Sequence, residues 1–256
     1  MFIITLKLKN SMDFISKNNI TWLSYFNNFQ ALAGVSTKTG GFSTGNYEGL
    51  NVGLNTADDK TIIQKNRELL FTTVAPQMEV IHINQTHSNI IHNTQDSSFK
   101  IFSDGDGLIT TERNKLLCIT LADCGSVVFH DEDFTVVCAI HCGWKGTQTG
   151  IIQAAINELL KHTELDKIHA YVGPMIRCSN YEVGKEFLGY FGSEHFKESN
   201  GKLFLDLNNV ILTTLMRANI GSVIDCGIDT YLSPETFYSH RLNNTTGRMC
   251  AFIGLK

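Results

Sequence analysis

The sequence predicts a single compact α+β domain. Runs typical of β-strands outnumber helical stretches and do not alternate with them regularly, which argues against a doubly wound parallel sheet. The chain has 256 residues, of which 43 % are hydrophobic and 18 % charged, so it can bury a large core. No internal repeat or proline-rich linker divides it. We therefore treat residues 1–256 as one domain, with residues 1–20 as a peripheral N-terminal segment.

Helical periodicity marks four segments. Between Lys60 and Ala75 apolar residues recur every three or four positions, and Asp59 precedes them where a carboxylate favours a helix N-terminus. Similar spacing predicts helices at Thr149–His162, Val183–Phe191 and Asn208–Asn219. Gly221 follows the last of these, as is typical of a helix C-terminus.

Strand-like runs lie between these helices. They are short, apolar and bounded by turn residues, and they comprise Glu79–Asn84, Gly107–Thr111, Leu116–Leu121, Ser126–His130, Thr135–Ile140, Ile168–Val172 and Ser222–Cys226. Two further runs, Thr236–Arg241 and Arg248–Leu255, flank a polar stretch at 243–247 that predicts a hairpin loop.

Composition excludes several classes of protein. Lys and Arg number 21 against 25 Asp and Glu, giving a net charge of −4, so nucleic acid and anionic membranes are disfavoured as partners. No apolar run approaches the roughly 18 residues that span a bilayer. The first lysines follow the apolar start instead of preceding it, unlike a secretory leader. Seven cysteines without a C-x-x-C pair fit a reducing, cytoplasmic setting; Met12 is an alternative start.

Three potential metal ligands lie just beyond or between predicted strands. They are His87 in a polar segment, Cys124 at a turn, and His141 where an apolar strand ends. If they converge at one end of a sheet, two imidazoles and a thiolate leave a fourth coordination position open, the ligand set of a catalytic zinc and one that copper tolerates. A structural cysteine and partly buried histidines explain the same residues without a metal. Other histidines, including His82 and His240, have no support beyond their identity.

Two loops suggest anion binding. Gly143 and Gly146 follow His141 and precede a helix, whose N-terminal N–H groups favour a phosphate or carboxylate. The glycine-rich segment 34–53 carries Lys38 among turn residues, and Arg241 and Arg248 flank the expected hairpin. Ordinary surface loops would have the same composition.

Several motifs together resemble the laccase-domain or multicopper polyphenol oxidoreductase family, members of which are also recognised as purine nucleoside phosphorylases. They run in the family's order from about residue 34 to the end: Ser36-Thr-Lys-Thr-Gly-Gly-Phe-Ser with Gly49-Leu-Asn-Val-Gly, Gln85-Thr-His, Asp106-Gly-Leu-Ile-Thr, Ala122-Asp-Cys, His141-Cys-Gly-Trp-Lys-Gly, Gly173-Pro with Tyr181-Glu-Val-Gly, and Thr246-Gly-Arg. Seven ordered motifs over most of the chain make the resemblance specific.

The resemblance implies layered mixed sheets and a metal held by His87, Cys124 and His141. It also implies phosphorolysis of adenosine, guanosine, inosine and methylthioadenosine, with adenosine deamination as a companion activity. The implied partners are purine nucleosides and inorganic phosphate, in a monomer or small homo-oligomer. Candidates for substrate or phosphate binding are Lys38, Asn51, Lys145, Arg241 and Arg248, and Asp123 is a candidate proton carrier or orienting group. The family often has arginine where this chain has Lys38 and Lys145, and a lysine holds phosphate only as a point charge.

Three other functions fit the same residues. Cys124 with His141 as base would make a metal-free cysteine hydrolase. Oxidation of phenols by copper, as the family name suggests, needs more copper ligands than these three residues supply. In a binding module the metal would be structural and closed by a fourth ligand, for which Cys142 is nearest in sequence, although its side chain would point to the opposite face of a strand.

Overall fold

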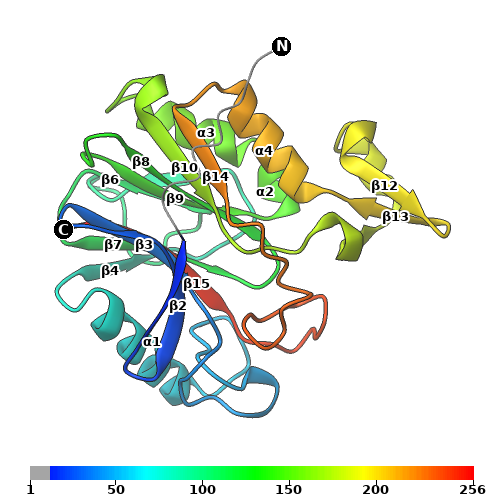
Figure 1. Cartoon of the computed structure of the whole chain (residues 1–256). Helices are drawn as coiled ribbons and strands as arrows, with labels where there is room; N and C mark the ends of the chain where they lie inside the picture. The colour runs from blue at the N-terminus through cyan, green and yellow to red at the C-terminus, as the bar shows by residue number, and fades with distance from the viewer. Residues whose placement is uncertain (1–11) are drawn as a thin grey trace.

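The computed structural model describes residues 12–256, and two six-stranded sheets pack face to face at its centre (Figure 1). The α+β class and the mixed sheets predicted from the sequence are confirmed. Part of the predicted peripheral segment, residues 1–11, lies outside the described residues. No helix in the described chain is long and apolar enough to cross a membrane.

The first sheet has the order β1-β2-β3-β15-β7-β4. Its strands are β1 (Asp13–Lys17), β2 (Ile20–Asn27), β3 (Ala31–Ser36), β15 (Met249–Leu255), β7 (Lys115–Leu121) and β4 (Glu79–His82). Neighbours are antiparallel, except that β4 runs parallel to β7 and pairs His82 with Cys118. This pairing places the last residue of β4 beside the middle of β7.

The second sheet has the order β14-β10-β8-β9-β6-β5. Its strands are β14 (Ser222–Asp225), β10 (Ile168–Val172), β8 (Gly125–Asp131), β9 (Val137–Cys142), β6 (Gly107–Thr110) and β5 (Ile91–Asn93). The outer pairs β10·β14 and β5·β6 are parallel and the inner pairs are antiparallel. The chain crosses from the first sheet to the second between β7 and β8, at Ala122, Asp123 and Cys124.

In the described part of the chain, four α-helices cover the outer faces of the two sheets: α1 (Lys60–Val74) on the first, and α2 (Trp144–Gln148), α3 (Ile151–Leu159) and α4 (Leu207–Arg217) on the second (Figure 1). The Asp59 side chain accepts hydrogen bonds from two N–H groups at the start of α1, as predicted for this carboxylate. A small sheet of β11 (Glu182–Val183), β13 (Lys202–Leu205) and β12 (Phe196–Ser199) projects to one side. Short 3-10 helices occupy Gly45–Tyr47, Leu165–Lys167, Cys178–Asn180, Lys185–Gly189 and Ser193–His195.

The core has three layers of buried side chains. One lies between the two sheets and includes Leu121 and Val128; one lies between the second sheet and α3 and α4; and one lies between the first sheet and α1, with Leu70 and Cys118. Because successive strand residues face opposite ways, β7 contributes Leu117 to the first layer and Cys118 to the third. The site described below lies at the end of β7, where these layers meet.

Two predicted elements are wrong. Val183–Phe191 is not an α-helix: β11 ends at Val183, and a 3-10 helix follows at Lys185–Gly189. Gly184 precedes this short helix and Gly189 is its last residue, and glycine disfavours a longer helix. Thr236–Arg241 is not a strand, and no hairpin joins it to β15. Its backbone makes turns instead, and the Arg241 N–H donates to the Asp123 carboxylate at 2.6 Å.

Candidate functional site

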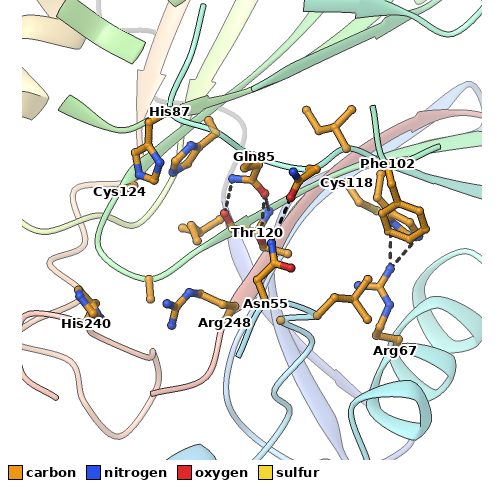
Figure 2. Close-up of a pocket in the computed structure, with 18 residues that line it drawn as sticks. Asn55, Arg67, Gln85, His87, Phe102, Cys118, Thr120, Cys124, His240 and Arg248 are labelled. Carbon is orange, nitrogen blue, oxygen red and sulfur yellow. Dashed lines mark hydrogen bonds between the residues drawn. The ribbon is translucent and has the colours of Figure 1, made fainter. Parts of the chain in front are cut away.

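His87, Cys124 and His141 come together at the junction of the two sheets. Their ligand atoms all lie within 4.8 Å of one another, and Figure 2 shows His87 and Cys124 next to each other at one end of the cavity. His87 lies in the loop after β4, Cys124 in the crossing between β7 and β8, and His141 in β9. The three residues are 37 and 17 positions apart in the chain, so the crossing of the sheets, not local spacing, assembles them.

Asp106 holds two of these residues in place. Its Oδ1 accepts a hydrogen bond from Nδ1 of His141 at 2.8 Å, which leaves Nε2 of that ring to face the other two candidate ligands, His87 and Cys124. Its Oδ2 accepts from the Ser88 N–H at 2.6 Å, the Ser88 hydroxyl at 2.8 Å and the Thr86 N–H at 3.1 Å. The carboxylate therefore fixes the ring of His141 and the backbone on both sides of His87, as carboxylates that hydrogen-bond to metal-ligating histidines do.

Gln85 anchors the same loop to β7. Its Nε2 donates to the Thr120 carbonyl oxygen at 2.8 Å, and its Oε1 accepts from the Thr120 N–H at 2.8 Å. His87 itself has φ of +59°, in the left-handed region that a non-glycine residue rarely adopts. The contacts of Gln85 and Asp106 on either side of His87 hold this backbone conformation.

Gly143 makes room for the two imidazoles. A Cβ at this position would lie 2.7 Å from Cδ2 of His87 and 3.3 Å from Cε1 of His141. At Gly146, a Cβ would lie 2.7 Å from the Ser88 carbonyl oxygen. Both glycines therefore serve close packing against the His87 loop, where the sequence predicted a turn or a close approach to a ligand.

The electrostatics of the group suit a cation. Burial raises the pKa of the Cys124 thiol, but His141 and His87 outweigh this effect and lower it to about 6. Burial lowers the pKa of His141, but Cys124 and Asp106 raise it to about 9. The pKa of Asp106 is raised by burial and lowered more strongly by hydrogen bonds from His141 and Ser88, to about 2. Two imidazole nitrogens, a thiolate and a carboxylate behind one ring match the ligands of a zinc site.

The open side of the group faces a cavity of about 390 Å³. One end is formed by His87, Cys124 and His141, and the other by Arg67, His82 and Phe102. Gln85 and Thr120 lie between the two ends, and His240 and Arg248 line the side shown below them in Figure 2. A small molecule can therefore contact the candidate metal ligands and the polar side chains farther along the cavity.

Comparison with known protein families identifies the family of the chain. The model of the multi-copper polyphenol oxidoreductase laccase family matches residues 32–256. The chain belongs to this laccase-like family. The resemblance predicted from the sequence motifs is thus confirmed.

Curated members of the laccase-like family carry a different name. The chain is 32 % identical to a purine nucleoside phosphorylase of Deinococcus radiodurans over 227 residues, covering 86 % of this chain and 87 % of that protein. It is 30 % identical to the purine nucleoside phosphorylase YlmD of Bacillus subtilis, covering 90 % of each. The crystal structure of YlmD from Geobacillus stearothermophilus matches with a TM-score of 0.85 and 28 % identity, covering 95 % of this chain and 98 % of that one.

Asp123 precedes a candidate metal ligand of this laccase-like chain, but its carboxylate contacts the C-terminal loops. Oδ1 accepts from the Thr230 hydroxyl at 2.6 Å, and Oδ2 accepts from the Ser239 hydroxyl at 3.0 Å and from the Arg241 N–H at 2.6 Å. The residue is buried and has φ of +81°. These contacts fit the orienting role among the two that the sequence left open.

Asn51 and Arg248 meet beside the cavity. Asn51 is fully buried, and its Oδ1 accepts from the N–H groups of Gly53 and Arg248 at 3.0 and 2.9 Å. Arg248 lines the cavity, and its Nη1 donates to the Thr246 and Gly247 carbonyl oxygens. Asn51 therefore acts through the backbone of Arg248, whereas the Arg248 side chain can contact a ligand.

The remaining predicted phosphate ligands do not line this cavity. Lys38 bonds through its backbone to Thr236 and Leu50, and Lys145 is exposed on α2. Arg241 is exposed, its Nη1 donates to the Glu182 carbonyl oxygen, and its guanidinium lies 5.1 Å from the centre of the Tyr181 ring.

Sequence reasoning missed four residues of the site. Asp106 and Gln85 lie in the family motifs, so their positions were marked but their roles were not. Arg67 follows Asn66 on the side of α1 that faces the core, and a charged residue at such a buried position signals a polar function. His82 precedes the polar segment at the end of β4 and had no distinguishing pattern.

Proposed function

We propose that this chain is a zinc-dependent purine nucleoside phosphorylase that converts a purine nucleoside and phosphate into the free base and ribose 1-phosphate. The observation that carries the proposal is the group His87, Cys124 and His141, which forms one end of a cavity and leaves its open side toward it. The names of relatives at 30 % and 32 % identity over most of their length support the substrate class.

Zinc fits the donor set. His87, Cys124 and His141 would hold the ion, and Asp106 would orient His141 through its Nδ1 hydrogen. When bound, zinc supplies a Lewis acid that polarises an oxygen of phosphate or substrate. The side chain of Cys142 packs between the second sheet and its helices, so it does not complete a closed structural site.

The reaction forms a bond between a phosphate oxygen and C1′ of the ribose while the bond from C1′ to the purine nitrogen breaks. The bonding electron pair leaves with the purine, which takes up a proton. Arg248 extends a half-buried guanidinium into the cavity, where it can balance the negative charge of phosphate. Asp123 and Asn51 hold the loops that position this arginine.

Product analysis with adenosine tests the proposal. We expect zinc-loaded protein to release adenine only when inorganic phosphate is present; inosine would reveal deamination, the companion activity that we also propose. Cys124→Ala should lose both zinc and adenine release, whereas Cys178→Ala, which removes a half-buried thiol outside the cavity, should retain both. A zinc-free Cys124→Ala enzyme with wild-type turnover would refute the role of the metal site.

One observation favours a second candidate, a metal-free cysteine hydrolase. The lowered pKa of Cys124 and the raised pKa of His141 describe a thiolate beside an imidazolium. Stoichiometric zinc in the purified active enzyme would occupy this thiolate and exclude the hydrolase. Activity that survives complete removal of zinc and disappears on alkylation of Cys124 would favour it.

A further inference from the structure

The end of the cavity opposite the candidate metal ligands contains a buried positive charge. Arg67, on α1, is only 6 % exposed and lines the cavity. Its Nη1 donates to the Val52 carbonyl oxygen at 3.0 Å, and its Nη2 lies 2.7 Å from Nε2 of His82. Within residues 12–256 no carboxylate forms an ion pair with Arg67. Its guanidinium carbon lies 5.2 Å from the centre of the Phe71 ring, a cation–π contact that brings no negative charge. Buried charges are normally paired with an opposite charge, so this guanidinium can still take an anion as partner.

His82 does not supply the missing negative charge. Burial and the neighbouring Arg67 lower the pKa of His82 to about 3, so its ring is neutral at pH 7 and accepts a hydrogen bond from the guanidinium. Burial also lowers the pKa of Arg67, but an arginine side chain keeps its proton in proteins. The pair therefore carries a net charge of about +1 against the cavity wall.

Some hydrogen-bond donors of the Arg67 guanidinium are not used within the part of the protein that the structure describes. An arginine side chain offers five N–H groups. Nη1 donates to the Val52 carbonyl oxygen, and Nη2 lies within hydrogen-bond distance of both ring nitrogens of His82, at 3.0 Å from Nδ1 and 2.7 Å from Nε2. The other N–H groups have no acceptor among the described residues. Two adjacent N–H groups of this kind match the oxygens of a phosphate.

This charge is separated from the metal ligands along β7. His82 pairs with Cys118 across β4 and β7, and the stretch from Cys118 to Leu121 spans about 10 Å at the rise of a β-strand before the chain turns toward Cys124. Figure 2 shows Arg67 and His87 on opposite sides of the cavity, with Gln85 and Thr120 between them. A ligand at Arg67 therefore does not compete for the position of the metal.

We propose that Arg67, oriented by His82, binds a phosphate group at this end of the cavity. The phosphate is either inorganic phosphate or the phosphate ester of a nucleotide, because both present the same oxygens. The site rests on the proposed function only for the choice of phosphate as the anion, and its occupancy is measured without turnover. In either case the Arg67 site adds a ligand contact beyond those made by the residues around the metal.

Equilibrium titration calorimetry on the zinc-loaded protein tests the site with inorganic phosphate, adenosine and adenosine 5′-monophosphate. We expect Arg67→Gln to weaken binding of a phosphate-bearing ligand by at least about tenfold, the loss of a hydrogen bond between charged groups, and to leave adenosine within about twofold. Arg217→Gln removes the same charge from the exposed face of α4 and should change nothing.

The ligands separate the two sources of phosphate. Inorganic phosphate that binds wild type at least about tenfold more tightly than Arg67→Gln shows that the Arg67 site takes free phosphate, in addition to the phosphate that reacts near Arg248. A preference for the nucleotide over adenosine that Arg67→Gln removes identifies a site for a phosphate ester. Wild-type binding of neither ligand, or equal binding of both by Arg67→Gln, overturns the proposal.

Two further measurements keep the test valid if Arg67→Gln unfolds. The ring proton resonances of His82 in the folded wild-type protein, assigned by comparison with His82→Gln, should shift on titration with phosphate, and unchanged resonances overturn the proposal. Cys124→Ala should retain phosphate binding, because it removes a ligand at the other end of the cavity. Failure of the phosphorylase function is thereby distinguished from failure of the Arg67 site.

Discussion

Replacement of Asp106 by Asn should weaken zinc binding although the two side chains have almost the same shape. The carboxylate accepts on both oxygens: His141 donates to Oδ1, and Ser88 and Thr86 donate to Oδ2. An asparagine has one oxygen and one NH₂ group. Whichever way the amide turns, either His141 loses its acceptor or the N–H groups around His87 face another donor.

The size of the effect follows from these contacts. Loss of a partner behind a metal ligand typically costs 10–100-fold in metal affinity, or about 1.4–2.7 kcal/mol. We expect Asp106→Asn to fall within this range, because the substitution disturbs one of the two histidine ligands in either orientation of the amide. Hydrogen bonds from Ser88 and His141 lower the pKa of Asp106 to about 2, so the carboxylate is ionised throughout the neutral range.

Competition with a chromophoric chelator measures the zinc dissociation constant of metal-depleted protein. Asp104→Asn is a matched control, because Asp104 is exposed two residues away and accepts from Asn84 at 2.6 Å without touching the three ligands. It should bind zinc as wild type does. A dissociation constant of Asp106→Asn within about twofold of wild type would show that Asp106 does not position the metal ligands.

Three further outcomes follow from the structure. In metal-free protein, alkylation of Cys124 should slow as the pH falls through about 6, and saturating zinc should block the alkylation. A midpoint near the ordinary thiol pKa of about 8.5 would contradict the effect of the two histidines on the thiol. Gly143→Ala places a methyl group 2.7 Å from His87 and should weaken zinc binding at least about tenfold, whereas Gly189→Ala, with nothing within 4 Å of its Cβ, should not. The pKa of His82 is about 3 in the folded protein and about 6.5 in the unfolded chain, so the unfolded state binds more protons below pH 6.5. The free energy of unfolding measured with urea should therefore fall as the pH drops below 6.5. An equally steep fall in His82→Gln would exclude this cause.

The candidate metal ligands were predictable because each lies at a strand end that the sequence marks. Apolar runs end just before Cys124 and at His141, and a polar segment surrounds His87. Their convergence could only be stated as a condition, since it depends on the crossing from β7 to β8 between two sheets. The roles of individual side chains were harder to predict from the sequence. Lys145 and Arg248 both lie in glycine-containing motifs, yet only Arg248 lines the cavity.

The fold was predicted least well where strands are short or lack alternation. Residues Ala31–Ser36 form a strand with every position buried, so no polar face reveals its period. Strands β11, β12 and β13 have two to four residues and depend on one another for pairing. The segment Thr236–Arg241 has the composition of a strand, but the Asp123 carboxylate binds the Arg241 N–H that a sheet would need.

Two neighbouring loops of the site each contain a non-glycine residue in the left-handed conformation, and a buried aspartate holds each of these loops. His87 and Asp123 both have positive φ, which costs about 1–3 kcal/mol at a non-glycine residue and persists only where the surroundings enforce it. At His87 the enforcing contacts come from Asp106, which binds the backbone on both sides. At Asp123 they come from its own carboxylate, which binds Thr230, Ser239 and the Arg241 N–H. Each aspartate thus uses its charge to hold a strained loop that carries or adjoins a metal ligand. A proton carried by Asp123 would weaken the contacts that place Cys124, and for this reason we propose the orienting role for it.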